Sequence, residues 1–117
     1  MAWEVLYTDE FGEWFETLAE DQQDAIIARV DLLEGHGPAL GRPIVDTVAR
    51  SRHANMKELR VSAGGALRLL FAFDPARQAV LLLGGDKAGQ WREWYADAIP
   101  RADDLFDTYL RDTGQVC

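Results

Sequence analysis

Residues 56–87 read MKELRVSAGGALRLLFAFDPARQAVLLLGGDK and decide the fold, because they hold three strand-like runs separated by two short turns. The runs cover residues 56–61, 66–74 and 79–84. Gly64 and Gly65 supply the positive φ that a tight hairpin needs, and Pro75 presets φ for the second turn. Connections this short predict an antiparallel three-stranded meander.

The middle run divides its side chains between the two faces of the predicted sheet. Because a strand has a period of two, one face carries Leu67, Leu69, Phe71 and Phe73, and the other carries Arg68, Leu70 and Ala72. Arg68 is thus a single charge on an otherwise apolar strand. Packing alone does not require it, so it marks a candidate site.

Two helices are predicted between a first strand at residues 3–7 and the meander. Apolar residues recur at helical spacing over residues 11–18 and again over residues 26–33. Thr8 or Asp9 is the expected N-cap of the first helix, and Asp21 that of the second. One continuous helix is an alternative, but we favour a helical hairpin.

The rest of the chain completes an α+β fold. Residues 35–55 are predicted to be irregular, and Pro100 is expected in the first turn of a last helix. The predicted order is β-α-α-β-β-β-α. The helical hairpin should pack on one face of the antiparallel sheet and leave the other face partly open around Arg68.

Length and composition limit the function classes. A chain of 117 residues predicts one domain, residues 1–117. It has no apolar run long enough to span a membrane, its N-terminus does not resemble a secretory signal, and its only cysteine is Cys117, which fits a reducing cytoplasm.

Charge is distributed unevenly along the chain. The net charge is −8, which argues against long-range attraction of nucleic acid. Residues 1–34 hold ten acidic side chains and one basic one, whereas residues 42–70 hold six basic and two acidic ones. The basic centre can therefore hold a phosphate locally.

Metal and cofactor chemistry finds little support in the sequence. His36 and His53 are separated by 17 positions and have no cysteine nearby, so no zinc spacing exists and no cofactor is expected. The run at 84–87, GGDK, resembles a phosphate loop only loosely, and a plain strand-ending turn with Lys87 at its tip is the alternative.

Basic side chains gather on the meander. Arg60 and Arg68 have even numbers on adjacent strands and should share one face across the hairpin. Lys57 lies on the first strand and Lys87 follows the third. In the alternative interpretation, Glu58 pairs with one of these arginines in a solvent-exposed ladder that contributes little.

The combination of these motifs resembles a known family. KELR at 57–60, LRLLFAF at 67–73, LLLGGDK at 81–87 and WY at 94–95 occur in the order found in RelE/HigB-type toxins of type II toxin–antitoxin systems, the phage-derived HigB branch in particular. The resemblance spans nearly the whole chain. It implies a RelE-like, microbial-RNase-type fold, a cytoplasmic toxin that cleaves mRNA on the ribosome, and an antitoxin partner, often with a helix-turn-helix domain.

The implied chemistry needs no metal, because a ribose 2′-OH attacks the adjacent phosphorus. Cationic side chains stabilise the charge that develops, and an acid and a base move the protons. We assign Arg60 and Arg68 to the phosphate, Lys57 and Lys87 to charge stabilisation or proton transfer, and Tyr95 to acid–base catalysis.

Further residues are candidates for RNA binding. Arg52 and His53 lie in the basic loop before the meander, where His53 is either a general base or an ordinary loop histidine. Trp91 is a candidate stacking surface for a base. The aromatic residues at 91–95 are equally suited to a core or hinge. Two non-enzymatic functions stay open: a ParE-like inhibitor of gyrase, and an inactive module that only binds its antitoxin.

Overall fold

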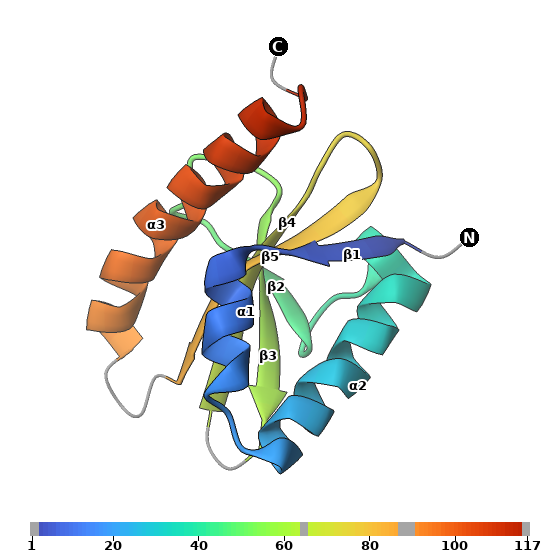
Figure 1. The fold of residues 1–117 in the computed structure, drawn as a ribbon, viewed down its shortest axis with the longest axis vertical. Coiled ribbons are helices and arrows are strands. Elements are labelled where there is room, and N and C mark those ends of the chain that lie inside the picture. Colours follow the sequence, from blue (N-terminus) through green and yellow to red (C-terminus); the bar gives the residue numbers. More distant parts are fainter. Residues whose placement is uncertain (1–2, 64–65, 87–90, 116–117) are drawn as a thin grey trace.

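The computed structural model of the chain describes residues 3–63, 66–86 and 91–115, and Figure 1 shows their arrangement. The centre is a five-stranded sheet with the strand order β1-β5-β4-β3-β2. In chain order the elements are β1 Glu4–Tyr7, α1 Asp9–Glu16, α2 Glu20–His36, the short 3-10 helix η1 Gly37–Ala39, β2 Val45–Thr47, β3 Met56–Ser62, β4 Ala66–Phe73, β5 Gln78–Asp86 and α3 Trp91–Asp112. β1 pairs with β5 in parallel, and the other strand pairs are antiparallel.

The predicted meander is confirmed as β3, β4 and β5. Its second turn is held by Asp74, whose carboxylate accepts hydrogen bonds from the backbone N–H groups of Ala76 and Gln78 at 3.0 and 2.8 Å. Arg77 takes a positive φ of 64° there. The hairpin glycines, Gly64 and Gly65, lie outside the described residues.

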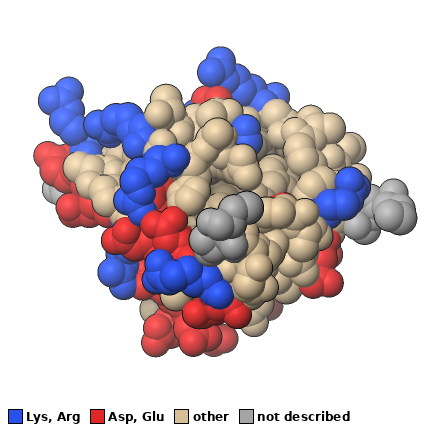
Figure 2. All heavy atoms as spheres, turned by 90° about the horizontal axis from the view of Figure 1, so that it is seen from above, with Lys and Arg blue, Asp and Glu red and all other residues tan. Residues whose placement is uncertain are grey.

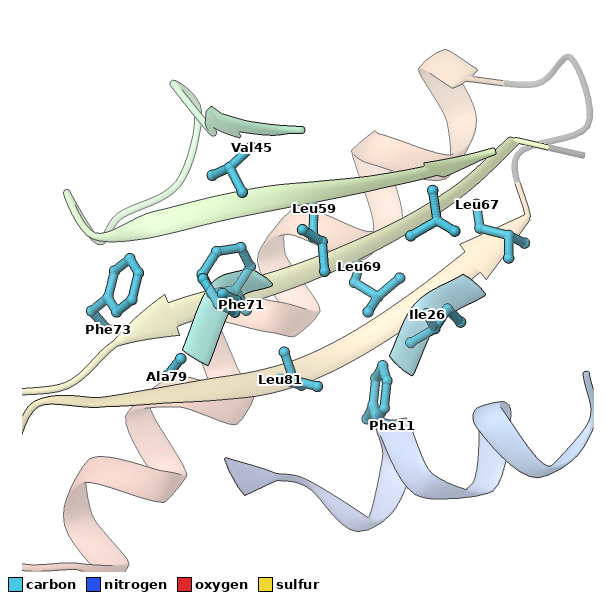
Figure 3. Close-up of a cluster of buried hydrophobic side chains, with 12 residues drawn as sticks. Phe11, Ile26, Val45, Leu59, Leu67, Leu69, Phe71, Phe73, Ala79 and Leu81 are labelled. Atoms are coloured by element: carbon cyan, nitrogen blue, oxygen red, sulfur yellow. The ribbon is translucent and has the colours of Figure 1, made fainter. Parts of the chain in front are cut away.

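The helical hairpin covers one face of the sheet, as predicted. Figure 3 shows Phe11 of α1 and Ile26 of α2 over the odd-numbered side chains of β4, including Leu67, Leu69 and Phe71. Each large apolar side chain buried in this layer contributes about 2 kcal/mol before the loss of conformational entropy is counted. The pattern of the middle run therefore fixes which face receives the hairpin.

The start of the second helix was predicted wrongly. Thr8 does cap α1, since its hydroxyl oxygen accepts a hydrogen bond from the Phe11 N–H at 3.0 Å. The N-cap of α2 is Ala19, however, and not Asp21. The side chain of Gln22 reaches back to accept from the Ala19 N–H at 3.1 Å, so it replaces the expected cap.

The opposite face of the sheet is covered by α3, which differs from the expectation. Pro100 lies inside this 22-residue helix and not in its first turn. A proline inside a helix removes one backbone hydrogen bond. The helix continues because buried side chains on both sides of the proline, among them Ile99 and Phe106, pack on Leu70 and Ala72 of β4. The prediction that this face stays open around Arg68 was therefore wrong, since Trp91 of α3 lies against Arg68, whose side chain is 16% exposed; a hollow remains between β2, β3 and α3.

A short strand was also missed. β2 forms within the stretch predicted to be irregular and pairs with β3 so that Asp46 lies opposite Glu58. The three residues of β2 have a charged residue at their centre and show no alternation that would predict a strand.

Among the helices of the described residues, none is long and apolar enough to cross a membrane.

Candidate active site

Arg60 and Arg68 lie directly opposite each other in the register of β3 and β4, on the face that α3 packs against. Between them lies the carboxylate of Glu58, which is 5% exposed. The Arg60 Nε donates to it at 3.0 Å, and the Arg68 Nε lies 3.9 Å away. The predicted pairing across the hairpin is therefore present, but the carboxylate at its centre is buried and not part of a solvent-exposed ladder.

α3 contributes two aromatic residues to this cluster. The Tyr95 hydroxyl donates a hydrogen bond to the Glu58 carboxylate. Trp91, one turn earlier, stacks on Tyr95 with ring centroids 5.9 Å apart, and the Arg68 guanidinium carbon lies 4.7 Å from the centroid of the Trp91 ring. Because this contact covers Arg68, its side chain is only 16% exposed, whereas that of Arg60 is 36% exposed.

Arg60 faces a hollow of about 210 Å³, which opens between β2, β3 and α3. Tyr95, Glu58 and Asp46 also line it. Asp46 accepts a hydrogen bond from Arg60 at 3.2 Å and another from Arg42 at 3.1 Å. Arg50 lines it as well, so the hollow offers two guanidinium groups, a phenol and two carboxylates, which are the groups that proton transfer and phosphate binding require.

Electrostatics fix the protonation states of two of these groups. Burial, followed by the hydrogen bond to Glu58, raises the pKa of Tyr95 to about 12. The hydrogen bond from Arg60 to Glu58 raises the pKa of the Arg60 guanidinium above its ordinary value. At neutral pH, the Tyr95 phenol is therefore protonated and Arg60 is a cation.

A second tyrosine behaves in the same way. Burial and a hydrogen bond to Asp74 raise the pKa of Tyr109 to about 12. Because the folded chain holds both phenols protonated above their ordinary pKa of 10.0, the stability that they contribute is complete below pH 10 and is lost as pH rises towards 12. We expect the urea midpoint to fall across this interval, and Tyr95→Phe to make the fall smaller. An unchanged fall in that variant would contradict the shifted pKa of Tyr95.

The other predicted site residues lie elsewhere or cannot be placed. Lys57 projects from the opposite face of β3, where its ammonium group donates to the Thr47 hydroxyl at 2.9 Å. It is not brought together with Arg60 and Arg68. Lys87 lies outside the described residues.

Arg52 and His53 join the loop before β3 to α3 and do not line the hollow, although Arg50 of the same loop does. The Ser51 hydroxyl donates to Asp103 at 2.5 Å, and the Arg52 backbone N–H donates to the same carboxylate at 3.1 Å. His53 Nε2 lies 2.7 Å from an Asp107 oxygen. Burial raises the pKa of Asp107, but the hydrogen bonds from Arg52 and His53 outweigh this and hold the pKa below its ordinary value. These contacts hold the loop against α3.

Asp103→Ala should destabilise the chain by about 2 kcal/mol, because it leaves the Ser51 hydroxyl and the Arg52 N–H without their buried acceptor. Asp104 is the matched control. It lies next to Asp103 and pairs with Arg52 at 3.2 Å, but it is 76% exposed, so Asp104→Ala should change stability by less than about 0.5 kcal/mol. Urea denaturation of both variants measures the difference, and equal losses would contradict a holding role for Asp103.

Charges of both signs are interspersed on one face of the molecule. Figure 2 shows Lys and Arg side chains interspersed with Asp and Glu on the face seen from above, with no continuous basic field. Within the described residues, no group of three or more histidine, cysteine, aspartate and glutamate side chains is placed to hold a metal ion. The described cations nearest to the hollow are Arg60 and Arg50, which line it, and Arg68 beside Arg60.

Sequence reasoning undervalued the two carboxylates. Glu58 was considered only as a partner in a surface ion pair, and Asp46 was placed in an irregular segment. The even number of Glu58, on the same face as Arg60, was a usable signal. Asp46 carried no such signal, because its position beside Glu58 depends on the pairing of β2 with β3, which the sequence pattern does not predict.

Comparison with known proteins decides the family. A profile of the family described as "Phage derived protein Gp49-like (DUF891)" matches residues 13–107. The chain belongs to this family. It is 52% identical over 106 residues to the Mycobacterium tuberculosis protein named "Putative toxin HigB3", a match that covers 91% of this chain and 92% of that protein. It is 47% identical over 104 residues to "Putative toxin HigB2" of the same organism, covering 87% of this chain and 52% of that protein, so it spans about half the length of HigB2.

Solved structures confirm the fold of this Gp49-like chain. A free-state mutant of the Escherichia coli toxin RelE superposes with a TM-score of 0.64 at 11% identity, over 86% of this chain and 98% of RelE. The toxin–antitoxin complex RelBE2 of M. tuberculosis gives a TM-score of 0.56 at 16% identity, over 74% of this chain and 99% of the matched chain. The predicted RelE-like α+β fold and the resemblance to the HigB branch of RelE/HigB-type toxins are thus confirmed.

Proposed function

We propose that this chain is the toxin of a type II toxin–antitoxin module and that it cleaves mRNA on the ribosome, in the cytoplasm, without a metal. The observation that carries the proposal is the convergence of Arg60, Arg68 and Tyr95 on the buried Glu58 carboxylate, beside an open hollow. Relatives that are about half identical in sequence are named as toxins, which supports the biological class.

The proposed reaction uses Glu58 as the general base and Tyr95 as the general acid. Glu58 accepts the proton of the ribose 2′-OH, whose oxygen forms a bond to the adjacent phosphorus while the bond from phosphorus to the 5′-oxygen breaks. Tyr95, held protonated by its raised pKa, supplies a proton to the leaving oxygen. The products are a 2′,3′-cyclic phosphate and a free 5′-hydroxyl, and no redox partner is needed.

The arginines stabilise the charge that builds up on the phosphate. Arg60 reaches the phosphate from the hollow, and its planar guanidinium suits a bidentate contact. Arg68, directly opposite Arg60 on β4 and covered by Trp91, adds a second positive charge from a position shielded from water, where the charge acts more strongly. Trp91 gives the RNA an aromatic surface at the edge of the cluster.

An antitoxin partner completes the proposal. Three similar solved structures are complexes of RelE toxins with RelB antitoxins, from Pyrococcus horikoshii, M. tuberculosis and Methanococcus jannaschii. We propose that a cognate antitoxin, of the helix-turn-helix type that the resemblance implies, binds this chain and suppresses its activity.

The test is expression of the chain with and without the product of the adjacent gene. We expect growth arrest without the partner, with new transcript 5′ ends that carry a hydroxyl and matching 3′ ends that carry a cyclic phosphate. Arrest with intact transcripts and a DNA-damage response would favour gyrase inhibition. Harmless expression would favour a module that only binds its antitoxin.

A further inference from the structure

A second hollow lies at the edge of β5, on the far side of α3 from the Arg60 site, and has a volume of about 260 Å³. The parallel pairing of β1 with β5 ends at Tyr7 and Leu81. Beyond this point, no described strand pairs with that side of β5. α1 and α3 flank the open edge instead, and they wall the hollow.

Two tryptophans form its aromatic walls, Trp14 from α1 and Trp94 from α3. Gly84 and Gly85 let them approach the strand, because a Cβ at Gly84 would overlap the Trp14 ring and a Cβ at Gly85 would overlap the Trp94 ring. Successive residues of a strand face opposite sides of the sheet. The two indoles therefore flank the strand edge from its two faces, and we call the space between them the Trp14–Trp94 cleft.

The described side chains that line this cleft carry a net negative charge, from Glu10, Asp97 and Arg101. Arg101 donates to Glu10, with Nε 2.5 Å from a carboxylate oxygen, so this pair is neutral as a unit. Asp97 is exposed and lines the cleft one turn of α3 earlier. Throughout residues 3–63, 66–86 and 91–115, no basic group forms an ion pair with Asp97. Among the described residues, this carboxylate beside two indole faces is thus not part of an ion pair.

We propose that the Trp14–Trp94 cleft receives an arginine side chain of the antitoxin. A guanidinium stacks its flat face on indole rings and donates along its edge to a carboxylate, so it matches both wall types at once. A nucleobase can also stack on the indoles and donate from its amino or imino groups to the carboxylate, but it is neutral, and the phosphates of its nucleotide would be repelled by Asp97 and Glu10, which line the cleft. The choice of partner rests on the proposed function, whereas the chemistry of the cleft does not.

The cleft is tested first without any partner, on the ¹⁵N-labelled chain, with N-acetylarginine amide as the probe. We expect the indole N–H signals of Trp14 and Trp94 to shift and that of Trp3 to stay in place.

Two variants test the role of the carboxylate. Asp97→Asn should weaken binding of the probe about threefold or more. Glu93→Gln should not weaken it, because Glu93 is an exposed residue one turn away that does not line the cleft. N-acetylcitrulline amide, which has the same shape without the charge, should bind more weakly. Equal binding of citrulline, or indole shifts with guanosine and none with arginine, would overturn the proposal.

The partner is tested on the complex with the antitoxin. Asp97→Arg should weaken the complex about tenfold or more by placing like charges together, and the matched reversal Glu93→Arg should weaken it less than about twofold. A chain with Asp97→Arg should still arrest growth and no longer be rescued by the antitoxin. An unaffected complex would show that the antitoxin does not occupy the cleft. If the unmodified chain never arrests growth, the proposed function fails, and the arginine titration still decides the chemistry of the cleft.

Discussion

Replacing Arg60 by alanine should lower the rate of RNA cleavage by about 100-fold to 1,000-fold, which is the loss expected when one preorganised group that stabilises transition-state charge is removed. Arg60 is the more exposed of the two arginines and the one that lines the hollow. No other described lysine or arginine on β3 faces the same side of the sheet. Growth arrest on expression and counts of cleaved transcript ends are the measurements.

Lys57→Ala is the matched control for this variant. Lys57 lies on the same strand and carries the same charge, but it projects from the opposite face and pairs with Thr47. We expect Lys57→Ala to leave cleavage within about threefold of the unmodified chain, since surface contacts of this kind contribute little. Equal losses in the two variants would mean that overall charge, and not the position of Arg60, governs activity.

Stability must be followed in the same experiment. Removing Arg60 leaves the buried Glu58 carboxylate with fewer partners, which can cost several kcal/mol. Arg60→Lys restores the charge but not the two-pronged guanidinium. If it regains stability while cleavage stays low, phosphate geometry is the cause. If cleavage recovers fully with stability, the role of Arg60 is structural.

Local patterns predicted the centre of the fold well. The alternation in β4 and the turn residues around Pro75 act within a few positions, so they are visible in one sequence. The same alternation also held information that the site assignment did not use. Lys57 has an odd number, so its side chain lies on the other face of the sheet from that of Arg60. With that reasoning, Glu58 would have replaced Lys57 in the candidate site.

Contacts between distant positions were not predictable in this way. The acceptor of Ser51 and Arg52 is Asp103, which lies about 50 positions later and is specified only once α3 packs on the sheet. Pro100 indicated a helix start, but burial of the residues on both sides of it extends the helix back to Trp91. This extension brings Trp91 and Tyr95 onto one helix face, where they stack.

Glu58→Gln should lower the cleavage rate by about 100-fold to 10,000-fold while RNA binding is retained, because the amide keeps the shape of the side chain and cannot accept the 2′-OH proton. Neutralising Glu58 also releases Arg60 from a 3.0 Å ion pair, so the affinity for RNA should stay equal or rise. This result would distinguish Glu58 as a general base from Glu58 as a purely structural carboxylate. Loss of a structural carboxylate would weaken RNA binding and cleavage together. Single-turnover cleavage and RNA binding, measured on the same preparation, separate the two.

Tyr95 reports independently on the same change. Its pKa of about 12 results first from burial and then from the Glu58 carboxylate, so the amide should lower this pKa without returning it to the ordinary value of 10.0. Ultraviolet titration of the phenol follows the change directly, with Tyr95→Phe to identify the signal. A lowered pKa with intact cleavage would leave Glu58 as the group that positions Tyr95 and would assign the proton transfer elsewhere. A lowered pKa with lost cleavage and preserved binding is what the general-base role of Glu58 requires.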